Sequence, residues 1–383
     1  MARAAASRRV CFVTGTRAEY GLMRSSLAAI ESNPKLELQL IVTGMHLDRR
    51  HGRSIQQIRT DGWLDRPRAH ALVSWRPPGG EPAVVAAATG NAISGIAKAI
   101  SDLKSQIVLI VGDRVEAFAA AAAGHIAGAV VAHVHGGDRA LGQADDSLRH
   151  AITKLAHVHF PATMASAQRI ARLGEDRWRI HRVGSPGLDG IVDTAASVKR
   201  LPRDFVLLVL HPTEADPKRE QARARLVLHA VRRSGVPRTI VIYPNNDPGS
   251  AGIIRCWEAE ANRERETIVR DLPRGQFLGL LRDAVTLVGN SSSGIIEAAS
   301  FGTPVIDIGP RQLGRERSAN VVNVPFDTAR IARELKRVWN GGRSVRHSKL
   351  NVYGGGGAGK RIADVLARLD LSDERLRRKL IAY

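Results

Sequence analysis

Side chains able to bind anions and to move protons follow nearly every predicted strand of this sequence, at the point where the strand ends. Because the carboxyl ends of parallel strands meet at one edge of a sheet, we expect these side chains to lie close together. Arginines beside helix starts suit a diphosphate, and carboxylates beside a histidine suit proton transfer at a neighbouring sugar or base. The segments concerned are 14–17, 44–46, 112–114, 133–138, 211–212, 244–247 and 289–293.

Each member of this set also has a structural interpretation. Asp113 can cap the helix that follows it, and Arg17 and Arg114 can be solvated surface residues. His133 and His135 come at the end of one predicted strand, and we expect one of them at the site and the other in the core. The set as a whole therefore predicts a catalytic site at this edge of the sheet.

A pair of aspartates and a run of serines each allow two roles. Asp145 and Asp146 open a helical segment that they can cap, and one of them can act as acid or base in a dehydrated site. Ser291, Ser292 and Ser293 precede another helical segment, where one serine would be enough as a cap. Hydroxyls, free amides and the positive end of a helix dipole also suit an anion, so both interpretations stay open at this point.

The composition is that of a globular protein with room for two domains, with 383 residues of which 44% are apolar and 25% charged. The formal net charge of +20 comes mostly from scattered arginines, and the aromatic content of 4% is too low for a base-stacking platform. We therefore expect no nucleic-acid partner.

Cys11 and Cys256 lie far apart and the histidines lack zinc-ligand spacing, so we expect neither disulfides nor a metal. Low cysteine use also fits a cytoplasmic location.

Apolar runs of strand length recur along the chain, each followed by a helical pattern. Runs without strict alternation predict strands buried on both faces, so the predicted fold class is α/β with doubly wound parallel sheets. Glycine, proline and small polar residues interrupt the pattern at 184–205, which predicts a domain boundary there. The most apolar region, 117–134, is divided by His125 and Gly128 into a helix and a strand, so we expect no membrane span. The basic start of the chain lacks the apolar core of a targeting signal.

Motifs in order along the chain resemble those of the hydrolysing UDP-N-acetylglucosamine 2-epimerases of sialic- and legionaminic-acid-type biosynthesis. The match runs from about residue 10 to residue 365 and includes VTGTRAEYGLM, TGMHLDRRHG, GDRVE, HVHGGD, RHAITKLAH, VGSPGLD, HPTE, YPNNDPGS and GNSSSGIIEAASFGTPVIDIGPRQLGR. The resemblance implies two Rossmann-like domains of the GT-B type, one at 1–190 for the sugar and one at 200–362 for the nucleotide. It also implies a final helix, 363–383, that crosses back to the first domain, a homodimer or homotetramer, and no cofactor.

The resemblance implies the conversion of UDP-N-acetylglucosamine, or of a GDP-linked or 2,4-diacetamido analogue, to a free N-acetylmannosamine-type sugar and a nucleoside diphosphate. The nucleotide leaves C1 as the C2 proton is removed, which gives a glycal. Water then adds to C1 while C2 is reprotonated on the opposite face. Arginines and a helix start would stabilise the charge that builds on the leaving diphosphate.

Roles for individual residues are implied by the same resemblance. Acid–base chemistry falls to Asp113, His135, Asp138, Asp145, Asp146 and His211. Contacts with the nucleotide sugar fall to Arg17, His46, Arg114, His211, Asn245, Leu272, Ser291, Ser292, Glu297 and Arg311. In this assignment Ser291 and Ser292 bind the diphosphate and Glu297 binds the ribose, which favours the anion-binding interpretation of the serine run.

Two positions depart from the pattern of the sialic-acid members. His135 stands where those members have glutamate, and Asp138 stands where glutamate is common. The departures leave one acid or base unassigned and weaken the case for plain UDP-N-acetylglucosamine as substrate. The alternatives are a GT-B glycosyltransferase, a non-hydrolysing UDP-N-acetylglucosamine 2-epimerase and a non-catalytic nucleotide-sugar sensor.

Overall fold

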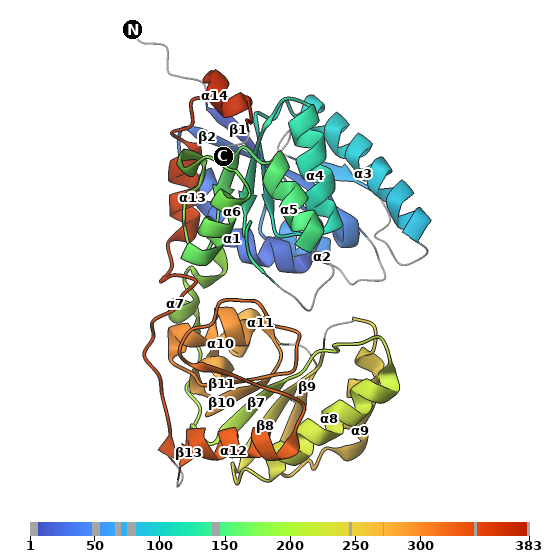
Figure 1. Ribbon diagram of the computed structural model, residues 1–383, viewed down its shortest axis with the longest axis vertical. Helices are drawn as coiled ribbons and strands as arrows, with labels where there is room; N and C mark the ends of the chain where they lie inside the picture. Colours follow the sequence, from blue (N-terminus) through green and yellow to red (C-terminus); the bar gives the residue numbers. More distant parts are fainter. Residues whose placement is uncertain are drawn as a thin grey trace. The chain divides into compact units, whose positions relative to one another are not determined.

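The protein is described by a computed structural model over residues 7–47, 54–65, 70–74, 82–139, 146–244, 247–270, 272–340 and 343–380. The chain forms two compact units (Figure 1). Unit 1 combines the described residues up to Asp138, those from 146 to 189 and those from Gly356 onward. Unit 2 consists mainly of the described residues of Gly190–Gly355.

Unit 1 is built on a six-stranded parallel sheet with the order β3-β2-β1-β4-β5-β6. Its strands are β1 Arg8–Thr14, β2 Leu36–Thr43, β3 His70–Val73, β4 Ile107–Val111, β5 Val130–Val134 and β6 Val158–Phe160. In β1, Val10 and Phe12 belong to the apolar cluster on one face, and Cys11 and Val13 belong to the cluster on the other. A strand that is covered on both faces needs consecutive apolar residues, which explains the non-alternating runs.

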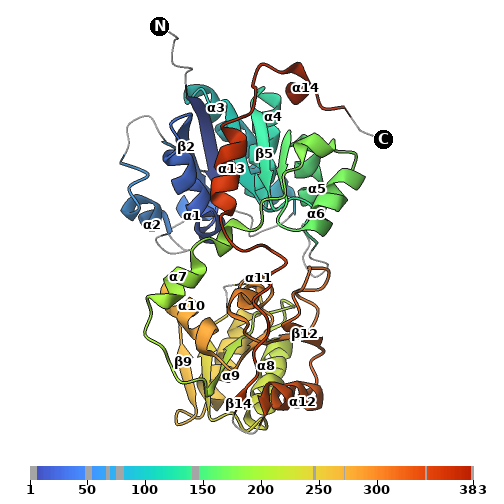
Figure 2. The same cartoon turned by 90° about the vertical axis from the view of Figure 1, so that its left-hand side faces the viewer.

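Helices cover both faces of this sheet (Figure 2). On the face of Phe12 lie α1 Arg17–Glu31 and α13 Ala358–Leu366. On the face of Cys11 lie α3 Pro82–Asp102, α4 Val115–Ile126 and α5 Asp146–Leu155. The other helical segments are η1 Gly44–Leu47, α2 Ser54–Thr60, α6 Met164–Arg172, η3 Arg177–Arg179, η4 Pro186–Leu188 and α14 Glu374–Arg377.

The predicted division of the most apolar region is confirmed, since α4 ends at Ile126 and β5 begins at Val130. By length and composition alone, one helix among the described residues could cross a membrane, namely Ala83–Asp102 within α3. Its Ile96 and Ile100 are buried in the core of unit 1.

Unit 2 contains a second six-stranded parallel sheet with the order β12-β11-β10-β7-β8-β9. Its strands are β7 Phe205–Val209, β8 Arg238–Ile242, β9 Glu266–Val269, β10 Thr286–Gly289, β11 Val305–Ile308 and β12 Val321–Val324. Its helical segments are α7 Ile191–Ala196, α8 Pro217–Arg232, α9 Ser250–Glu260, α10 Arg274–Asp283, α11 Ser292–Ile296, η5 Ala298–Phe301 and α12 Thr328–Val338. A short antiparallel pair, β13 Trp339–Asn340 and β14 Arg343–Ser344, follows α12.

The chain returns to unit 1 through α13, which packs beside α1 (Figure 2). The carboxylate of Asp189 accepts hydrogen bonds from the backbone N–H groups of Ala358, at 2.9 Å, and Gly359, at 2.7 Å. These two N–H groups begin the helix and have no partner within it, so the carboxylate acts as a cap from a distant segment. The predicted α/β fold, with two doubly wound sheets and a last helix that crosses back, is confirmed.

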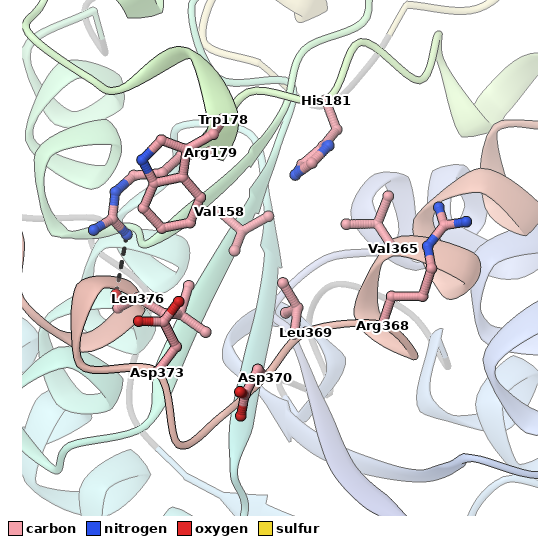
Figure 3. A pocket seen from close by; sticks show the side chains of 10 residues that line it. All are labelled: Val158, Trp178, Arg179, His181, Val365, Arg368, Leu369, Asp370, Asp373 and Leu376. Atoms are coloured by element: carbon pink, nitrogen blue, oxygen red, sulfur yellow. Dashed lines mark hydrogen bonds between the residues drawn. The ribbon is translucent and has the colours of Figure 1, made fainter.

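Beyond α13 the chain is held by the buried side chain of Arg179. Its guanidinium donates hydrogen bonds to the main-chain oxygens of Leu376, at 3.0 Å, and Arg378, at 2.9 Å. Beside it lies a hollow of about 240 Å³, lined in part by Trp178 and Leu369 (Figure 3). The oxygen of Leu369 accepts a hydrogen bond from Arg8 at the start of β1, so this hollow lies at the amino edge of the sheet.

The close approach of α13 to α1 gives a first prediction. A Cβ atom on Gly359 would lie 2.7 Å from backbone atoms of Ser25 and Ser26, so Gly359→Ala should lower the free energy of unfolding by about 1–3 kcal/mol. A Cβ on Gly21, inside α1, meets no atom within 4 Å, and Gly21→Ala should raise stability by roughly 0.5–1 kcal/mol. Urea unfolding of both variants measures the difference, and equal stabilities would contradict this packing.

Candidate active site

A buried carboxyl pair supports the loops at the carboxyl edge of unit 1. Thr16 caps α1, and Glu19 completes a capping box by accepting hydrogen bonds from the N–H groups of Gly15, at 2.8 Å, and Thr16, at 2.9 Å. Glu116, from the start of α4, lies against the same loops. A Cβ on Gly15 would come 2.5 Å from Glu116, and one on Gly44 would come 2.9 Å from it. Both positions therefore require glycine.

The two carboxyl groups interact. Burial and the negative charge of Glu116 raise the pKa of Glu19 to about 7, although Arg114 and the N–H groups of Gly15 and Thr16 oppose the rise. Glu19 is consequently protonated at slightly acidic pH, although its ordinary pKa is 4.5.

Arg114, Arg17 and His46 occupy this edge with different exposure. The Arg114 side chain is 45% exposed, and its guanidinium pairs with Glu116 at 3.4 Å and contacts the sulfur of Met45 at 3.8 Å. Arg17 is exposed at the start of α1. His46 is buried, its Nε2 lies 3.0 Å from the hydroxyl of Thr14, and burial lowers its pKa to about 4. His46 is therefore neutral at pH 7.

Arg149, on α5, joins three segments of the same edge. Its side chain is only 5% exposed; it forms ion pairs with Asp113, which follows β4, and with Asp146 at 2.9 Å. Its guanidinium also donates to the main-chain oxygen of Asp138, which follows β5. The predicted catalytic residues Asp113, Asp138 and Asp146 thus meet around an arginine that the sequence analysis did not select. Asp145, the remaining aspartate of that prediction, lies outside the described residues.

One of the two histidines lies in the core and the other at the edge of the sheet, as expected, because the chain leaves β5 after Val134 and turns at His135. Nε2 of His133 donates to the oxygen of Gly112 at 2.7 Å, and burial lowers its pKa to about 3, so it is a neutral core residue. His135 lies in the left-handed region with φ of 62°. Its Nδ1 is 2.8 Å from a carboxylate oxygen of Asp138, and its Nε2 is 3.1 Å from the hydroxyl of Ser185. Ser185 was not singled out in the sequence analysis.

In unit 2, Asn290 connects the loops after β7 and β10. Its side-chain amide accepts from the N–H of His211 at 2.7 Å and donates to the oxygen of His211 at 2.8 Å. Gln312 donates to the main-chain oxygen of Asn290 at 2.9 Å. Burial lowers the pKa of His211 to about 3, with Arg311 contributing, so His211 is neutral at pH 7. The amides of Asn290 and Gln312 therefore hold these loops in place. Asn290 directly follows β10, and Gln312 lies in the turn after β11.

The serine run forms the cap that its simpler interpretation predicts. The hydroxyl of Ser291 accepts a hydrogen bond from the N–H of Ser293 at 3.4 Å, and α11 begins at Ser292. Gly289 has φ of 133°, and a Cβ there would clash with the main-chain oxygen of Val209, so the ends of β10 and β7 approach closely only with glycine. Capping does not exclude a ligand at the same loop.

The remaining nucleotide contacts predicted for unit 2 are Arg311, Glu297, Leu272 and Asn245. Arg311 pairs with Asp247 at 3.3 Å, and burial lowers the pKa of its guanidinium. Glu297 pairs with Arg274 at 2.7 Å through one carboxylate oxygen, while its other oxygen is buried. Leu272 precedes α10. Asn245 lies outside the described residues. Among the residues that the structure describes, no group of three or more histidine, cysteine, aspartate or glutamate side chains could hold a metal ion.

The buried carboxyl pair predicts a pH dependence of stability. Between pH 4.5 and about 7 the folded protein keeps a proton on Glu19 that the unfolded chain has lost, so this stabilisation is complete below pH 4.5 and is lost as pH rises through 7. Glu19→Gln keeps an oxygen for the two N–H groups but does not titrate. The unfolding free energy should drop between pH 5 and pH 8 in the wild type, and this drop should exceed that of the variant by on the order of 2 kcal/mol. Parallel pH profiles would contradict the raised pKa.

The sequence matches one known protein family over most of its length. A family model described as UDP-N-acetylglucosamine 2-epimerase matches residues 28–367. A UDP-N,N'-diacetylbacillosamine 2-epimerase (hydrolyzing) of Legionella pneumophila is 33% identical over 376 residues, with 96% of this chain and 97% of the relative covered. A UDP-N-acetylglucosamine 2-epimerase of Neisseria meningitidis is 33% identical over 352 residues, with 90% and 91% covered.

A solved structure has the same fold. The crystal structure of UDP-GlcNAc 2-epimerase from Neisseria meningitidis bound to UDP-GlcNAc aligns with a TM-score of 0.77 and 17% identity, covering 94% of this chain and all of that one. The likeness extends to both Rossmann-like units and is of the GT-B type. The family match covers most of the sequence, and the chain belongs to the UDP-N-acetylglucosamine 2-epimerase family.

Proposed function

We propose that this enzyme is a hydrolysing nucleotide-sugar 2-epimerase. It converts UDP-N-acetylglucosamine, or a GDP-linked or 2,4-diacetamido analogue, to a free N-acetylmannosamine-type sugar and a nucleoside diphosphate. The observation that carries the proposal is the gathering of Asp113, Asp138 and Asp146 around Arg149 at the carboxyl edge of unit 1. The hydrolysing activity named for the Legionella pneumophila relative supports the release of a free sugar and favours the diacetamido substrate.

In unit 2 the proposed ligand is the nucleotide. Arg311 supplies a guanidinium for the diphosphate, and the hydroxyls of Ser291 and Ser292 with the N–H groups of their turn supply further donors. The buried second oxygen of Glu297 is an acceptor suited to a ribose hydroxyl. The remaining proposed contacts are His211, Asn245 and Leu272 in unit 2 and Arg17, His46 and Arg114 in unit 1.

The proposed reaction needs both a base and an acid because the C2 hydrogen leaves one face of the sugar and a proton returns to the other. Asp113 and Asp146 are the proposed bases, and their ion pairs with Arg149 hold both carboxylates at this edge. The proposed acid–base set is completed by Asp145, His135, Asp138 and His211. Neutral His211 can donate one hydrogen bond and accept another, and arginines offset the charge on the departing diphosphate.

Proton NMR in deuterated water tests the activity and identifies the substrate together. UDP-N-acetylglucosamine, GDP-N-acetylglucosamine and UDP-linked 2,4-diacetamido-2,4,6-trideoxyglucose are incubated separately with the enzyme. A free manno-configured sugar with deuterium at C2 is the expected product in at least one tube. A nucleotide-linked epimer would indicate the non-hydrolysing reaction instead, and sugar transfer to an added acceptor with C2 hydrogen retained would indicate a glycosyltransferase.

The catalytic assignment is tested with a matched pair of aspartates. Asp113→Asn should lower kcat at least 100-fold while UDP still binds, because the substitution removes a base but leaves unit 2 intact. Asp102, at the end of α3, is an exposed partner of Lys98, so Asp102→Asn should leave kcat unchanged. Full turnover by Asp113→Asn would refute the assignment.

The nucleotide assignment is tested by calorimetric titration with UDP. Arg311→Gln should weaken binding at least about tenfold, since a half-buried guanidinium is replaced by a neutral amide. Arg330→Gln is the matched control, because Arg330 is exposed on α12 and its loss removes the same charge. We expect this variant to bind UDP as the wild type does. Equal affinities in the two variants would show that Arg311 contributes only to the net charge.

A further inference from the structure

Both ring nitrogens of His135 are occupied by side chains of unit 1. Asp138 lies at Nδ1, 2.8 Å away, and Ser185 lies at Nε2, 3.1 Å away. A carboxylate can only accept, so Nδ1 carries a proton and Nε2 is the position that gains or loses one. The group at that position is a hydroxyl, which donates to neutral Nε2 and accepts from protonated Nε2. His135 can therefore change its charge without losing either hydrogen bond.

The surroundings hold this arrangement rigidly. The second oxygen of Asp138 accepts from the hydroxyl of Ser166 at 2.7 Å, and Ser166 accepts from the hydroxyl of Thr163 at 2.9 Å. The backbone N–H of His135 donates to the oxygen of Phe160 at 3.1 Å. These contacts come from β5, β6 and α6, so the imidazole is oriented by several elements rather than by its own strand alone.

Ser185 belongs to the segment that follows β6 at the same edge of the sheet. Val183 donates its N–H to the oxygen of Pro161 at 3.2 Å, which continues the pairing beyond β6. Ser185 directly precedes the short helix η4, and its main-chain oxygen accepts from the N–H of Leu188 at 3.1 Å. Ser185 is 1% exposed. A proton that leaves Nε2 of His135 in this geometry therefore passes first to this hydroxyl.

We propose that Asp138, His135 and Ser185 form a proton relay that supplies the proton returned to C2 of the sugar. The proposal rests on the hydrolysing epimerase function proposed above. It separates two roles that the reaction requires: the aspartates ion-paired with Arg149 act as bases, and the relay acts as the acid. It also gives the histidine that replaces the expected glutamate a definite task.

The relay moves one proton from the imidazolium of His135 to carbon. Nε2 of His135 gives its proton to the oxygen of Ser185, and the hydroxyl proton of Ser185 moves to C2 of the glycal. The electron pair of the C1=C2 double bond forms the new C2–H bond, and water adds its oxygen to C1. The proton lost by that water goes to a carboxylate beside Arg149, and His135 is left neutral. Asp138 stays ionised and stabilises the imidazolium before the transfer.

Three serine variants test the relay by turnover and product. Ser185→Ala removes the hydroxyl and should lower kcat at least about tenfold with little change in KM. Ser185→Thr should restore turnover, because it keeps the hydroxyl and threonine readily adopts the extended backbone of this position. Ser25→Ala is the matched control. The hydroxyl of Ser25 donates to the oxygen of Pro186 in the same segment, at 3.2 Å, but does not contact His135, so kcat should be unchanged.

The product distribution separates proton return from mere loop stability. In Ser185→Ala the bases still remove the C2 proton, so the glycal should accumulate and its vinyl proton should appear by NMR, but not in the wild type or Ser25→Ala. Ser185→Ala with wild-type kcat, or with a loss that Ser25→Ala shares, overturns the relay. A wild type that releases no free sugar from any of the three substrates overturns the proposed function as well.

Nitrogen-15 spectra of histidine-labelled protein test the geometry without turnover. His135 is identified by the signal missing from His135→Gln. The wild type should show a protonated Nδ1 and an unprotonated, hydrogen-bonded Nε2 in the neutral ring, and Ser185→Ala should shift only the Nε2 signal. A protonated Nε2 in the neutral ring, or signals that Ser185→Ala leaves unchanged, would contradict the relay even if the enzyme hydrolyses its substrate.

Discussion

The ion pairs of Arg149 are the interaction on which the carboxyl edge of unit 1 depends. A guanidinium with 5% exposure is stable only if its charge is compensated by well-placed partners. Asp113, Asp146 and the main-chain oxygen of Asp138 come from the loop after β4, the start of α5 and the loop after β5. Loss of one partner leaves charge buried without compensation, so these three segments keep a single arrangement. The carboxylates that are proposed to move protons are ordered by the same contacts.

The two units share an architecture but carry different charges at their strand ends. Unit 1 gathers carboxyl groups over a second buried pair, Glu19 and Glu116, and holds His135 between an acid and a hydroxyl. Unit 2 has neutral donors beside arginines that are paired with carboxylates, with His211 uncharged, Arg311 paired to Asp247 and Arg274 paired to Glu297. The first arrangement suits proton transfer and the second suits an anion. The same doubly wound fold thus supports two tasks because function lies in the loops.

Much of the fold could be predicted because the central strands of both sheets are buried on both faces and their apolar runs show this directly. The division of the region around Gly128 could be predicted for the same local reason. The separation of His133 from His135 depends instead on the left-handed backbone of His135, since residues two apart on a strand would share a face. The ties between distant segments could not. Asp189 begins α13 from outside that helix, and nothing in the local sequence of either segment shows the contact.

For the candidate site, the sequence by itself determined which side chains stand at the strand ends, and a glycine at Gly289 permits close approach there. The Thr16 and Glu19 spacing of a capping box was also readable locally. Arg149 looked like an ordinary helix residue three positions from an aspartate, and Ser185 like part of a linker. Only the tertiary structure decided that Arg149 is buried among carboxylates and that Ser185 meets His135. Partners and protonation depend on which distant groups cover a side chain and exclude water from it, and local sequence does not contain that information.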